Sequence, residues 1–341
     1  MLRIVDRKLE GAVATAGAGG PSWLVPPERP DGIGCVAFER AFVVLPQFLP
    51  VTPTGETFLD AFRVYGDGKY AHLFGPEAAA ALERHVPALR QAPLGSGCFV
   101  LGGARNHYHW LVDFLPRLAV LKRRPDLAAH PVLVNGDFDD AQRAALDLAR
   151  GALDLPDLDL RPVPGAVAGL TRPVFPTRVT LPAAVAFWRG VVAATGRASP
   201  AGTRRLFVCR AGAGQRRLLD EEAAVAILAG AGFEAVDPAG LAIGEQMRLF
   251  SGAQWIIGTH GAGLANIVFA PPGARLVELR AAAHPLLYAE LARAGGQPVA
   301  AIPLAEVADS HCEPLHRDVR LGAAGLAALG RLVAALGRAQ A

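Results

Sequence analysis

"RLFVCRAGAGQRRLLDEEAAVAILAGAGFEAVDPAGLAIGEQMRLFSGAQWIIGTHGAG" (residues 205–263) alternates short apolar runs with longer amphipathic ones. The short runs have the length of buried strands, and the longer runs have the length and spacing of helices. Strands that alternate with helices in this way predict βαβ units and a parallel sheet. The expected strands are 205–210, 233–237 and 254–258, and the expected helices are 220–232 and 244–253.

The alternation continues on both sides of this stretch. After it we expect a short helix within 259–270, strands at 275–279 and 298–304, a helix at 284–294 and an amphipathic last helix at 325–341. Before it we expect strands at 99–103 and 130–137 and helices at 106–124, 139–153 and 183–195. Asp139 is placed to cap its helix, and Gly232 is placed to end the helix at 220–232.

A Pro- and Gly-rich segment at 154–202 separates two parts of the chain. We expect an N-terminal domain over 1–195, irregular and β-rich over 1–90 and α/β over 91–195. A second, Rossmann-like domain over 196–322 follows, with a C-terminal helix at 323–341. In the first part, YGDGKY (65–70) carries an Asp-Gly turn between strand-like flanks, which predicts a β-hairpin.

The composition excludes several classes of protein. With 52% apolar and 19% charged residues, the 341-residue chain suits a globular core, and a net charge of +3 is too small for a nucleic-acid partner. The N-terminus mixes charges into its first residues and lacks the apolar region of a signal peptide, so we expect a soluble, cytoplasmic protein. The last helix could touch a membrane, although packing back onto the protein is favoured. The cysteines lie far apart without a CxxC pair, which favours buried free thiols over a zinc site or disulfides: Cys35, Cys98, Cys209 and Cys312.

The turn THGAGLAN (259–266) follows an expected strand of the parallel sheet. Ligands bind at the carboxyl ends of such strands, and glycines let the backbone come close to them. A helix that begins near Gly263 would add free N–H groups that favour an anion such as a phosphate. The third glycine of a dinucleotide fingerprint and the GK[ST] of a P-loop are both absent. A tight packing corner is the alternative, but His260 and Asn266 flank the glycines and favour binding.

Three ordered blocks together resemble glycosyltransferase family 61. THGAGLANIVFAPPGARLVEL (259–279) is similar to the family's HGAG turn, PPG and strand ending in Glu. NHYHWLVDFLPRL (106–118) is similar to its HW, acidic and LPRL segment. The arginines, GF and EQ of residues 205–263 are similar to a third block. Asp220 is a departure, since an Asn is usual there.

The resemblance implies a GT-B-like α/β fold, with two Rossmann-like domains facing a cleft and extra β-hairpin elements near the N-terminus. It also implies an inverting transfer of a sugar from a nucleotide-sugar donor, expected to be UDP-linked, to a hydroxyl of a glycan or glycoconjugate. Bacterial members serve capsule, lipopolysaccharide or exopolysaccharide synthesis, which suggests the inner face of the cytoplasmic membrane. No metal or other cofactor is expected, because GT-B enzymes use helix N-termini and cationic side chains to stabilise the leaving diphosphate.

The donor would bind to the C-terminal half. The turn supplies backbone donors, and the arginines at a neighbouring strand end supply positive charge, which suits phosphate oxygens. Arg216 and Arg217 have the alternative of a solvated loop face. Glu278 could accept ribose hydroxyls, with a structural cap or ion pair as the alternative. The candidate donor-binding residues are Arg210, Arg216, Arg217, His260, Gly261, Ala262, Gly263, Asn266 and Glu278.

The acceptor would meet the helix at 106–124. His109, Asp113 and Arg117 have a spacing that puts them on one polar helical face, opposite a leucine stripe. His109 and Asp113 are the candidate catalytic residues, either with a direct base or with Asp113 orienting His109. The alternative is an Asp113–Arg117 salt bridge with His109 merely exposed. Pro116 should kink this helix, and Trp110 is either core or a sugar platform.

Two other functions remain open at this point. A nucleotide-sugar epimerase or hydrolase would use the same donor site without an acceptor. A non-catalytic sugar-nucleotide-binding protein would keep the fold alone, although the joint presence of His109, Asp113, Arg210 and His260 argues against loss of the site.

Overall fold

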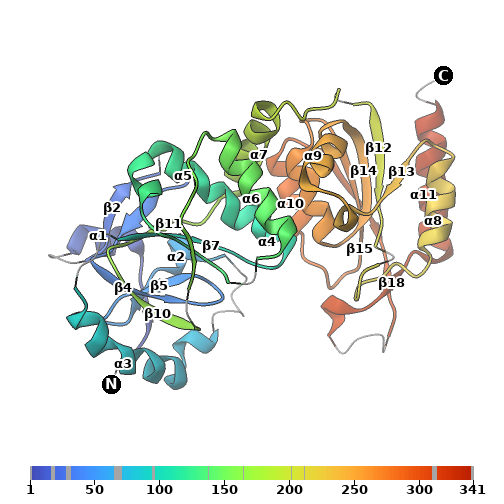
Figure 1. Cartoon of the computed structure of the whole chain (residues 1–341). Coiled ribbons are helices and arrows are strands. Elements are labelled where there is room, and N and C mark those ends of the chain that lie inside the picture. The colour runs from blue at the N-terminus through green and yellow to red at the C-terminus, as the bar shows by residue number, and fades with distance from the viewer. Residues whose placement is uncertain are drawn as a thin grey trace. The chain divides into compact units, whose positions relative to one another are not determined.

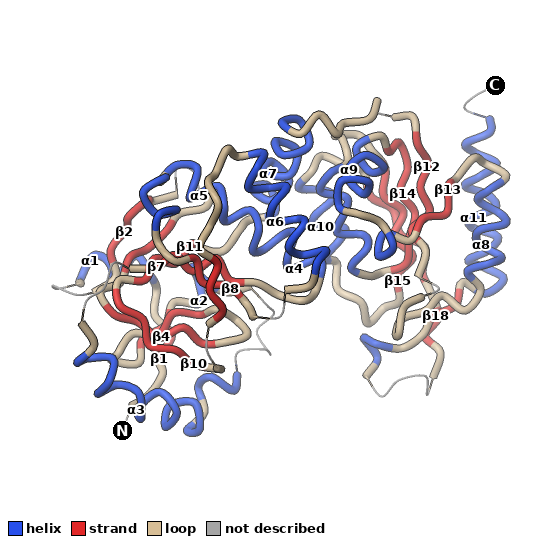
Figure 2. Tube along the Cα trace, viewed as in Figure 1, coloured by secondary structure: helices blue, strands red, loops and turns tan. Residues whose placement is uncertain are grey.

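The computed structural model describes residues 2–16, 20–27, 32–64, 71–93, 97–136, 138–163, 165–200, 202–210, 212–308 and 313–338 (Figure 1). The chain forms two compact units, Met1–Ala184 (unit 1) and Val185–Ala341 (unit 2). Helices and strands are mixed in both units, as Figure 2 shows. The expected α/β class is therefore confirmed.

Unit 1 is built on a six-stranded sheet with the order β2-β3-β11-β7-β8-β9. Its strands β11, β7, β8 and β9 are parallel neighbours, whereas β2 and β3 pair antiparallel at one edge. The apolar runs at 99–103 and 130–137 form the central strands β7 and β8, as expected. The bounds are β2 Ser22–Val25, β3 Cys35–Ala37, β7 Cys98–Gly102, β8 Val132–Val134, β9 Leu160–Pro162 and β11 Pro173–Pro176.

Smaller sheets complete the N-terminal region. β10 (Val167–Thr171), β4 (Arg40–Val44) and β5 (Leu49–Val51) form an antiparallel sheet, and β1 (Val5–Asp6) pairs in parallel with β6 (Glu56–Thr57). The helices of this region are α1 Leu9–Thr15, α2 Leu59–Phe62, η2 Ala71–Phe74 and α3 Pro76–Gln91.

The β-hairpin expected around YGDGKY is not supported, because its flanks are not strands. Residues 65–70 lie outside the described residues, but the flanks are the helices α2 and η2 rather than strands. Tertiary packing decides this: Phe58 and Phe62, one helical turn apart, are both buried against Phe38. The Asp60 carboxylate also accepts from the backbone N–H of Leu9.

The expected helices 139–153 and 183–195 are present as α6 (Asp140–Ala152) and α7 (Leu181–Ala194). Asp139 caps α6 as predicted, since its carboxylate accepts from Gln142 N at 2.8 Å. In return, the side-chain oxygen of Gln142 accepts from Asp139 N at 3.2 Å. The boundary between the units falls within α7.

The segment expected as one helix over 106–124 is broken into four pieces. They are α4 His107–His109, the π-turn η3 Trp110–Phe114, the 3₁₀ turn η4 Leu115–Arg117 and α5 Leu118–Arg123. Pro116 has no N–H to donate, so the regular ladder ends before it, and the kink expected at this residue is confirmed. The 3₁₀ helix η5 (Pro125–Ala129) follows.

Unit 2 contains a five-stranded sheet of order β13-β12-β14-β15-β16. All its neighbours are parallel, which confirms the βαβ series predicted from residues 205–304. Gly232 has φ +73° just past α8, as a helix-ending glycine should. The bounds are β12 Arg204–Val208, α8 Glu221–Ala229, β13 Glu234–Val236, η6 Pro238–Gly240, α9 Ile243–Ser251, β14 Ala253–Thr259, η7 Ala262–Phe269, β15 Arg275–Arg280, α10 Leu287–Ala294 and β16 Val299–Pro303.

The two faces of this sheet are covered by different helices. Phe207, Ile257, Val277 and Leu279 point to a core shared with α8 and the last helix, α11 (Gly322–Arg338). Side chains alternate along a strand, so Glu278 points to the other face, where α9, α10 and η7 pack (Figure 1).

The last helix packs back onto the protein. Leu329 and Leu336 are buried in the same core as the sheet, and α11 lies against α8. The strands β17 (Ala305–Glu306) and β18 (Val319–Arg320) and the turn η8 (Pro314–His316) lead into it. Across the described parts of the chain, no helix is both long and apolar enough to cross a membrane.

We expect Leu329→Ala to lower the free energy of unfolding by about 2–5 kcal/mol, because Leu329 is fully buried between α11 and the sheet. The exposed neighbour Arg331→Ala should change it by less than about 0.5 kcal/mol. Urea denaturation followed by circular dichroism measures both. Equal effects of the two substitutions would contradict the packing of α11.

Candidate functional site

The carboxyl ends of three neighbouring strands of unit 2 carry most of the polar residues singled out in the sequence. The parallel register puts Val208 of β12, Gly258 of β14 and Glu278 of β15 at one level. The segments that follow these strands therefore leave the sheet side by side. In an open parallel sheet this edge is where ligands bind.

Arg210 leaves β12 and lies directly over the glycine turn. A Cβ atom on Gly261 would stand 1.8 Å from Arg210 Nη1, so only glycine leaves room for the guanidinium. Arg210 Nη2 donates to Gln215 O at 3.0 Å and its Nε donates to Arg216 O at 3.3 Å. Its backbone N–H donates to Glu221 Oε2 at 2.8 Å. The arginine is thus fixed by the loop that follows it.

Arg216 is a second cation at the same place. Burial, and then the nearby charge of Arg216, lower the pKa of Arg210, and burial also lowers the pKa of Arg216. Arg216 has φ +55°, a conformation that costs a non-glycine residue free energy. Within the described part of the chain, neither Arg210 nor Arg216 forms an ion pair with a carboxylate. Two partly buried guanidinium groups without a counter-ion favour an anionic ligand.

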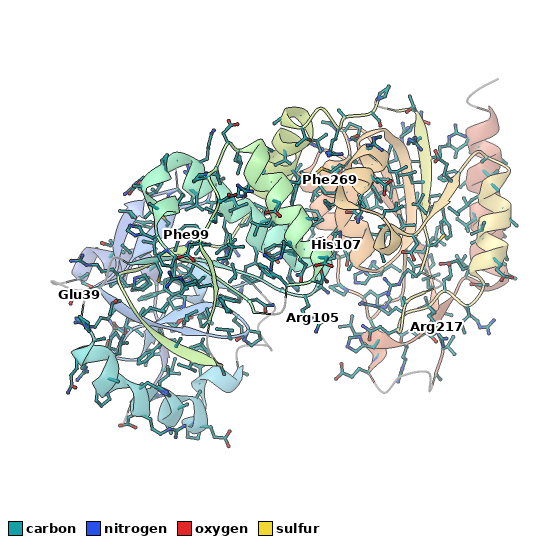
Figure 3. The ribbon with its side chains drawn as sticks, in the orientation of Figure 1. Glu39, Phe99, Arg105, His107, Arg217 and Phe269 are labelled. Carbon is teal, nitrogen blue, oxygen red and sulfur yellow. The ribbon has the colours of Figure 1, made fainter. Side chains whose placement is uncertain are left out.

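Arg217, labelled in Figure 3, points elsewhere. Its Nη2 lies 2.6 Å from Oδ2 of the buried Asp318, and its backbone N–H donates to Oδ1 of the same carboxylate at 2.9 Å. The proposed phosphate contact of Arg217 therefore has a structural ion pair as its competitor, and the other two arginines are the better-placed cations.

His260 and Glu278 form a buried pair on the same side of the sheet. His260 Nδ1 lies 2.7 Å from Glu278 Oε1, and the two side chains are almost without exposed surface. Burial lowers the pKa of His260, opposed by the hydrogen bond and charge of Glu278. A carboxylate on Nδ1 fixes the tautomer that leaves the Nε2 lone pair on the neutral ring. Glu278 therefore orients His260, which is the ion-pair alternative of the sequence analysis rather than the ribose contact.

Two residues that the sequence analysis did not single out complete this group. The ring of His284 stacks on His260, with centroids 4.6 Å apart and planes at 22°, and Tyr288 of α10 meets His260 edge-on at 4.8 Å. Both are buried. Burial and the neighbouring His260, Arg216, Arg280 and Arg210 lower the pKa of His284 to about 3. A histidine six residues after a strand-end glutamate was the only signal in the sequence.

The glycine turn forms the first residues of η7, a 3₁₀ helix. Gly261 is its N-cap, and Ala262 and Gly263 open its first turn with partly exposed backbone. A Cβ on Gly263 would meet Val208 Cγ1 at 3.2 Å, so this glycine also permits a close approach. Asn266 is completely buried within the helix, which is apolar on all sides and packs against α9 and α10.

Several buried polar atoms around these residues have no hydrogen-bond partner among the described residues. Buried polar groups are nearly always paired in native proteins, so these atoms are the ones that a bound ligand or a water molecule would pair with. The atoms concerned are Arg216 Nε, Thr259 Oγ1, Glu278 Oε2, Arg280 Nε and His284 Nε2. Arg280 Nε and Glu278 Oε2 lie 4.0 Å apart, which is an ion pair without a hydrogen bond.

Unit 1 contains the second predicted group. His109 Nδ1 lies 2.7 Å from Asp113 Oδ2, so the predicted pair is formed. Asn106 caps α4, since its side chain accepts from Tyr108 N at 2.9 Å. Burial raises the pKa of Asp113, opposed by His109 and then Arg117. Figure 3 marks the position of this turn by Arg105 and His107.

Arg117 differs from the expected polar helical face, and Trp110 follows the core alternative of the sequence analysis. Arg117 is buried rather than on an open face; it donates to Leu101 O at 3.1 Å and lies over the Phe114 ring. The reason is the π-turn, which breaks the helical spacing on which the face was predicted. Trp110 is core and not a sugar platform, because its Nε1 donates to Gln142 O at 3.2 Å and its ring packs on Phe138.

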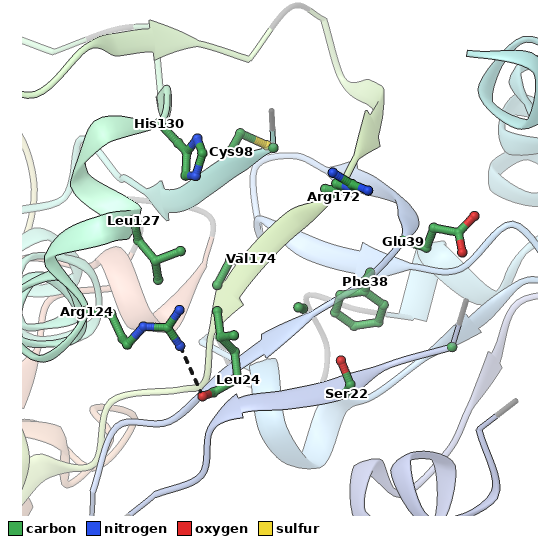
Figure 4. Close-up of a pocket in the computed structure, with 13 residues that line it drawn as sticks. Ser22, Leu24, Phe38, Glu39, Cys98, Arg124, Leu127, His130, Arg172 and Val174 are labelled. Carbon is green, nitrogen blue, oxygen red and sulfur yellow. Dashed lines mark hydrogen bonds between the residues drawn. The ribbon is translucent and has the colours of Figure 1, made fainter. Parts of the chain in front are cut away.

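Other features of the molecule contain none of the predicted site residues. A pocket of about 480 Å³ in unit 1 lies beside Cys98, at the amino end of β7, and is lined by Arg124, His130 and Arg172 (Figure 4). Cys35, Cys98 and Cys209 are free thiols, as expected, and Cys312 lies outside the described residues. Among the described side chains, no group of three His, Cys, Asp or Glu could hold a metal ion.

The comparison with known families decides the class. The model described as "Glycosyltransferase 61" matches residues 107–277, which is half of the chain. The chain belongs to glycosyltransferase family 61. No curated protein matches it.

This glycosyltransferase carries both polar groups within or at the edge of the matched region, which begins at His107 and ends beside Glu278. The departure at Asp220 has a structural role here: its two carboxylate oxygens accept from Leu321 N and Gly322 N at 3.0 and 2.9 Å. The EQ pair of the family pattern also serves the fold. Glu245 accepts from Ala242 N at the start of α9, and Gln246 donates to Leu241 O.

His284 makes the stability of the glycosyltransferase depend on pH. Its pKa is about 3 in the folded state, against about 6.5 in an unfolded chain, so only the unfolded chain binds the proton between these values. Stability is therefore full above about pH 6.5 and falls as the pH drops toward 3. The charged and titratable groups around His284 are Arg210, Arg216, Arg280, His260, Glu278 and Tyr288.

We expect His284→Gln to reduce the slope of the free energy of unfolding against pH by up to about 1.4 kcal/mol per unit between about pH 4 and about pH 6. Urea denaturation at several pH values measures the slope. His85→Gln, on the exposed part of α3, is the matched control. An unchanged slope in the His284 variant would show that His284 is already protonated in the folded protein.

Proposed function

We propose that this glycosyltransferase transfers a sugar, with inversion, from a nucleotide-sugar donor to a hydroxyl of a glycan or glycoconjugate. The donor diphosphate would bind at the strand ends of unit 2. The observation that carries this proposal is a pair of cations without an ion-pair partner among the described residues: Arg210, which lies over the glycine turn, and its neighbour Arg216. Guanidinium groups match phosphate oxygens in geometry and charge.

The leaving group gains negative charge as the bond between the sugar and the phosphate breaks. Cations held in place before the reaction stabilise that charge without reorganisation, which is the usual source of most of the rate enhancement. Arg210 is held by Gln215 O and Arg216 O, so its orientation is set in the free protein. The backbone N–H groups at the start of η7 would add donors from the turn Gly261–Ala262–Gly263.

The acceptor hydroxyl would be deprotonated by the pair in unit 1. With Asp113 on Nδ1, the neutral ring of His109 takes a proton at Nε2, and the carboxylate stabilises the imidazolium that results. The acceptor oxygen forms a bond to the anomeric carbon while the bond to the phosphate oxygen breaks. The hydroxyl proton goes to His109, and the nucleoside diphosphate leaves with the bonding electrons.

The remaining parts of the proposal rest on the family. We propose a GT-B arrangement with the donor on the C-terminal domain, a UDP-linked donor and stabilisation of the leaving group without a metal. We also propose a cytoplasmic enzyme that works at the inner membrane face in capsule, lipopolysaccharide or exopolysaccharide synthesis. The buried arginine pair supports cationic side chains as the partners of the diphosphate.

Arg210→Ala should weaken binding of UDP by about 10-fold to 100-fold, because a charge-assisted hydrogen bond contributes roughly 1.5–3 kcal/mol. Isothermal titration calorimetry measures the affinity, after a thermal-shift screen of nucleoside diphosphates has confirmed that the nucleobase is uracil. Arg205→Ala is the matched control, since Arg205 lies in β12, the strand that leads to Arg210, but donates to Ala231 O at the other end of that strand. Unchanged affinity in the Arg210 variant would remove this residue from the donor site.

Asp113→Asn should retain donor binding and lower the rate of transfer by about 10²-fold to 10⁴-fold, because the neutral amide no longer stabilises the His109 imidazolium. Turnover of the nucleotide sugar with and without acceptor separates transfer from hydrolysis. The exposed Asp147→Asn controls for a lost carboxylate in unit 1. Transfer near the wild-type rate would place the base elsewhere, with His260 next to test.

A further inference from the structure

The ring of His284 is held in one orientation beside the proposed donor site. The loop between β15 and α10 carries it, and Arg280 Nη1 donates to His284 O at 2.8 Å. Its imidazole stacks on that of His260 and is buried. The ring is therefore part of a rigid group rather than a mobile surface side chain.

Hydrogen bonding fixes where the proton of this ring lies. His284 Nδ1 accepts from the backbone N–H of Ala281 at 3.4 Å, so the neutral imidazole carries its proton on Nε2. Burial, and then the neighbouring His260 and arginines, keep the ring neutral, since they lower its pKa to about 3. His260 has the opposite tautomer, because its Nδ1 donates to Glu278. The two stacked rings thus differ: His284 is a hydrogen-bond donor at Nε2, and neutral His260 is an acceptor there.

The described residues offer no acceptor to the N–H of His284. Its Nε2 is buried and has no hydrogen-bond partner among them, and a buried N–H without a partner destabilises the free protein. Arg216 Nε and Arg280 Nε are unpartnered donors in the same surroundings, as the charges that act on His284 show. A ligand that satisfies them must present several acceptor oxygens and carry negative charge. A diphosphate meets both requirements, whereas a neutral sugar has acceptor oxygens but no negative charge.

We propose that His284 is a further donor-binding residue, whose Nε2–H donates a hydrogen bond to a phosphate oxygen of the bound nucleoside diphosphate. This inference rests on the proposed function, because it takes the diphosphate to lie at the strand ends of unit 2. It assigns to a neutral imidazole a contact that the sequence motifs assigned only to arginines and backbone N–H groups. Its neutrality matters, since a further cation between Arg216 and Arg280 would be repelled.

Calorimetric titration with UDP and with inorganic pyrophosphate tests the inference in the full chain. His284→Phe keeps a flat ring to stack on His260 but has no donor, so it should weaken both ligands by about 10-fold to 100-fold. His284→Gln places an amide N–H near the position of Nε2 and should recover most of the affinity. His85→Phe, on exposed α3, should bind as the wild type does.

A second measurement separates binding from a merely structural role. In ¹⁵N-labelled protein, the imidazole correlations of His284 should show the Nε2–H tautomer, and the Nε2 resonance should shift when pyrophosphate is added. Wild-type pyrophosphate affinity in His284→Phe, or an Nδ1–H tautomer, would overturn the inference. If His284→Phe loses its thermal unfolding transition, it is misfolded and its loss of affinity does not count. The affinity of His284→Gln and the tautomer of the wild-type ring then decide.

The outcomes also distinguish this inference from the proposed function. If UDP and pyrophosphate bind the wild type and Arg210→Ala weakens them while His284→Phe does not, only the role of His284 is overturned. If the wild type binds neither UDP nor pyrophosphate, the proposed donor site fails and the role of His284 fails with it.

Discussion

The buried hydrogen bond between His260 and Glu278 is the interaction on which the donor-side group depends. At 2.7 Å it joins the segment after β14 to β15, and it fixes both the tautomer and the plane of the histidine ring. The His284 ring stacks on the His260 ring, and the Tyr288 ring contacts it edge-on. The glycine next to His260 then admits the guanidinium of Arg210. One pairing across two strand ends thus positions a ring stack and a cation.

Each of the two candidate groups holds a histidine–carboxylate pair, and the surroundings give these two pairs different properties. Both pairs join Nδ1 to a carboxylate oxygen at 2.7 Å. His109 and Asp113 keep some exposed surface, which suits exchange of a proton with an acceptor. His260 and Glu278 are almost fully buried next to arginines, which suits a ring that remains neutral beside an anion. The same two residue types can therefore serve a proton transfer in one unit and ligand positioning in the other.

Local rules predicted much of the fold. The β/α alternation of residues 205–304, the Asp139 cap and the break at Pro116 follow from periodicity, capping and the missing N–H of proline. The hairpin flanks were wrong because buried phenylalanines outweigh the strand-like pattern at 57–64. The prediction that Arg117 lies on a polar helical face was wrong, because a π-turn changes the angular spacing of side chains. No local sequence pattern predicted that turn.

The sequence by itself determined the α/β class, the parallel sheet of unit 2, the family and the residues that gather at its strand ends. Those properties depend on periodicity and on short motifs, which neighbouring residues carry. Only the tertiary structure decided which arginines have a carboxylate partner, that Glu278 orients His260, and that His284 belongs to the group. These depend on distances between segments far apart in the chain, and on burial, which sets the charge state of each side chain.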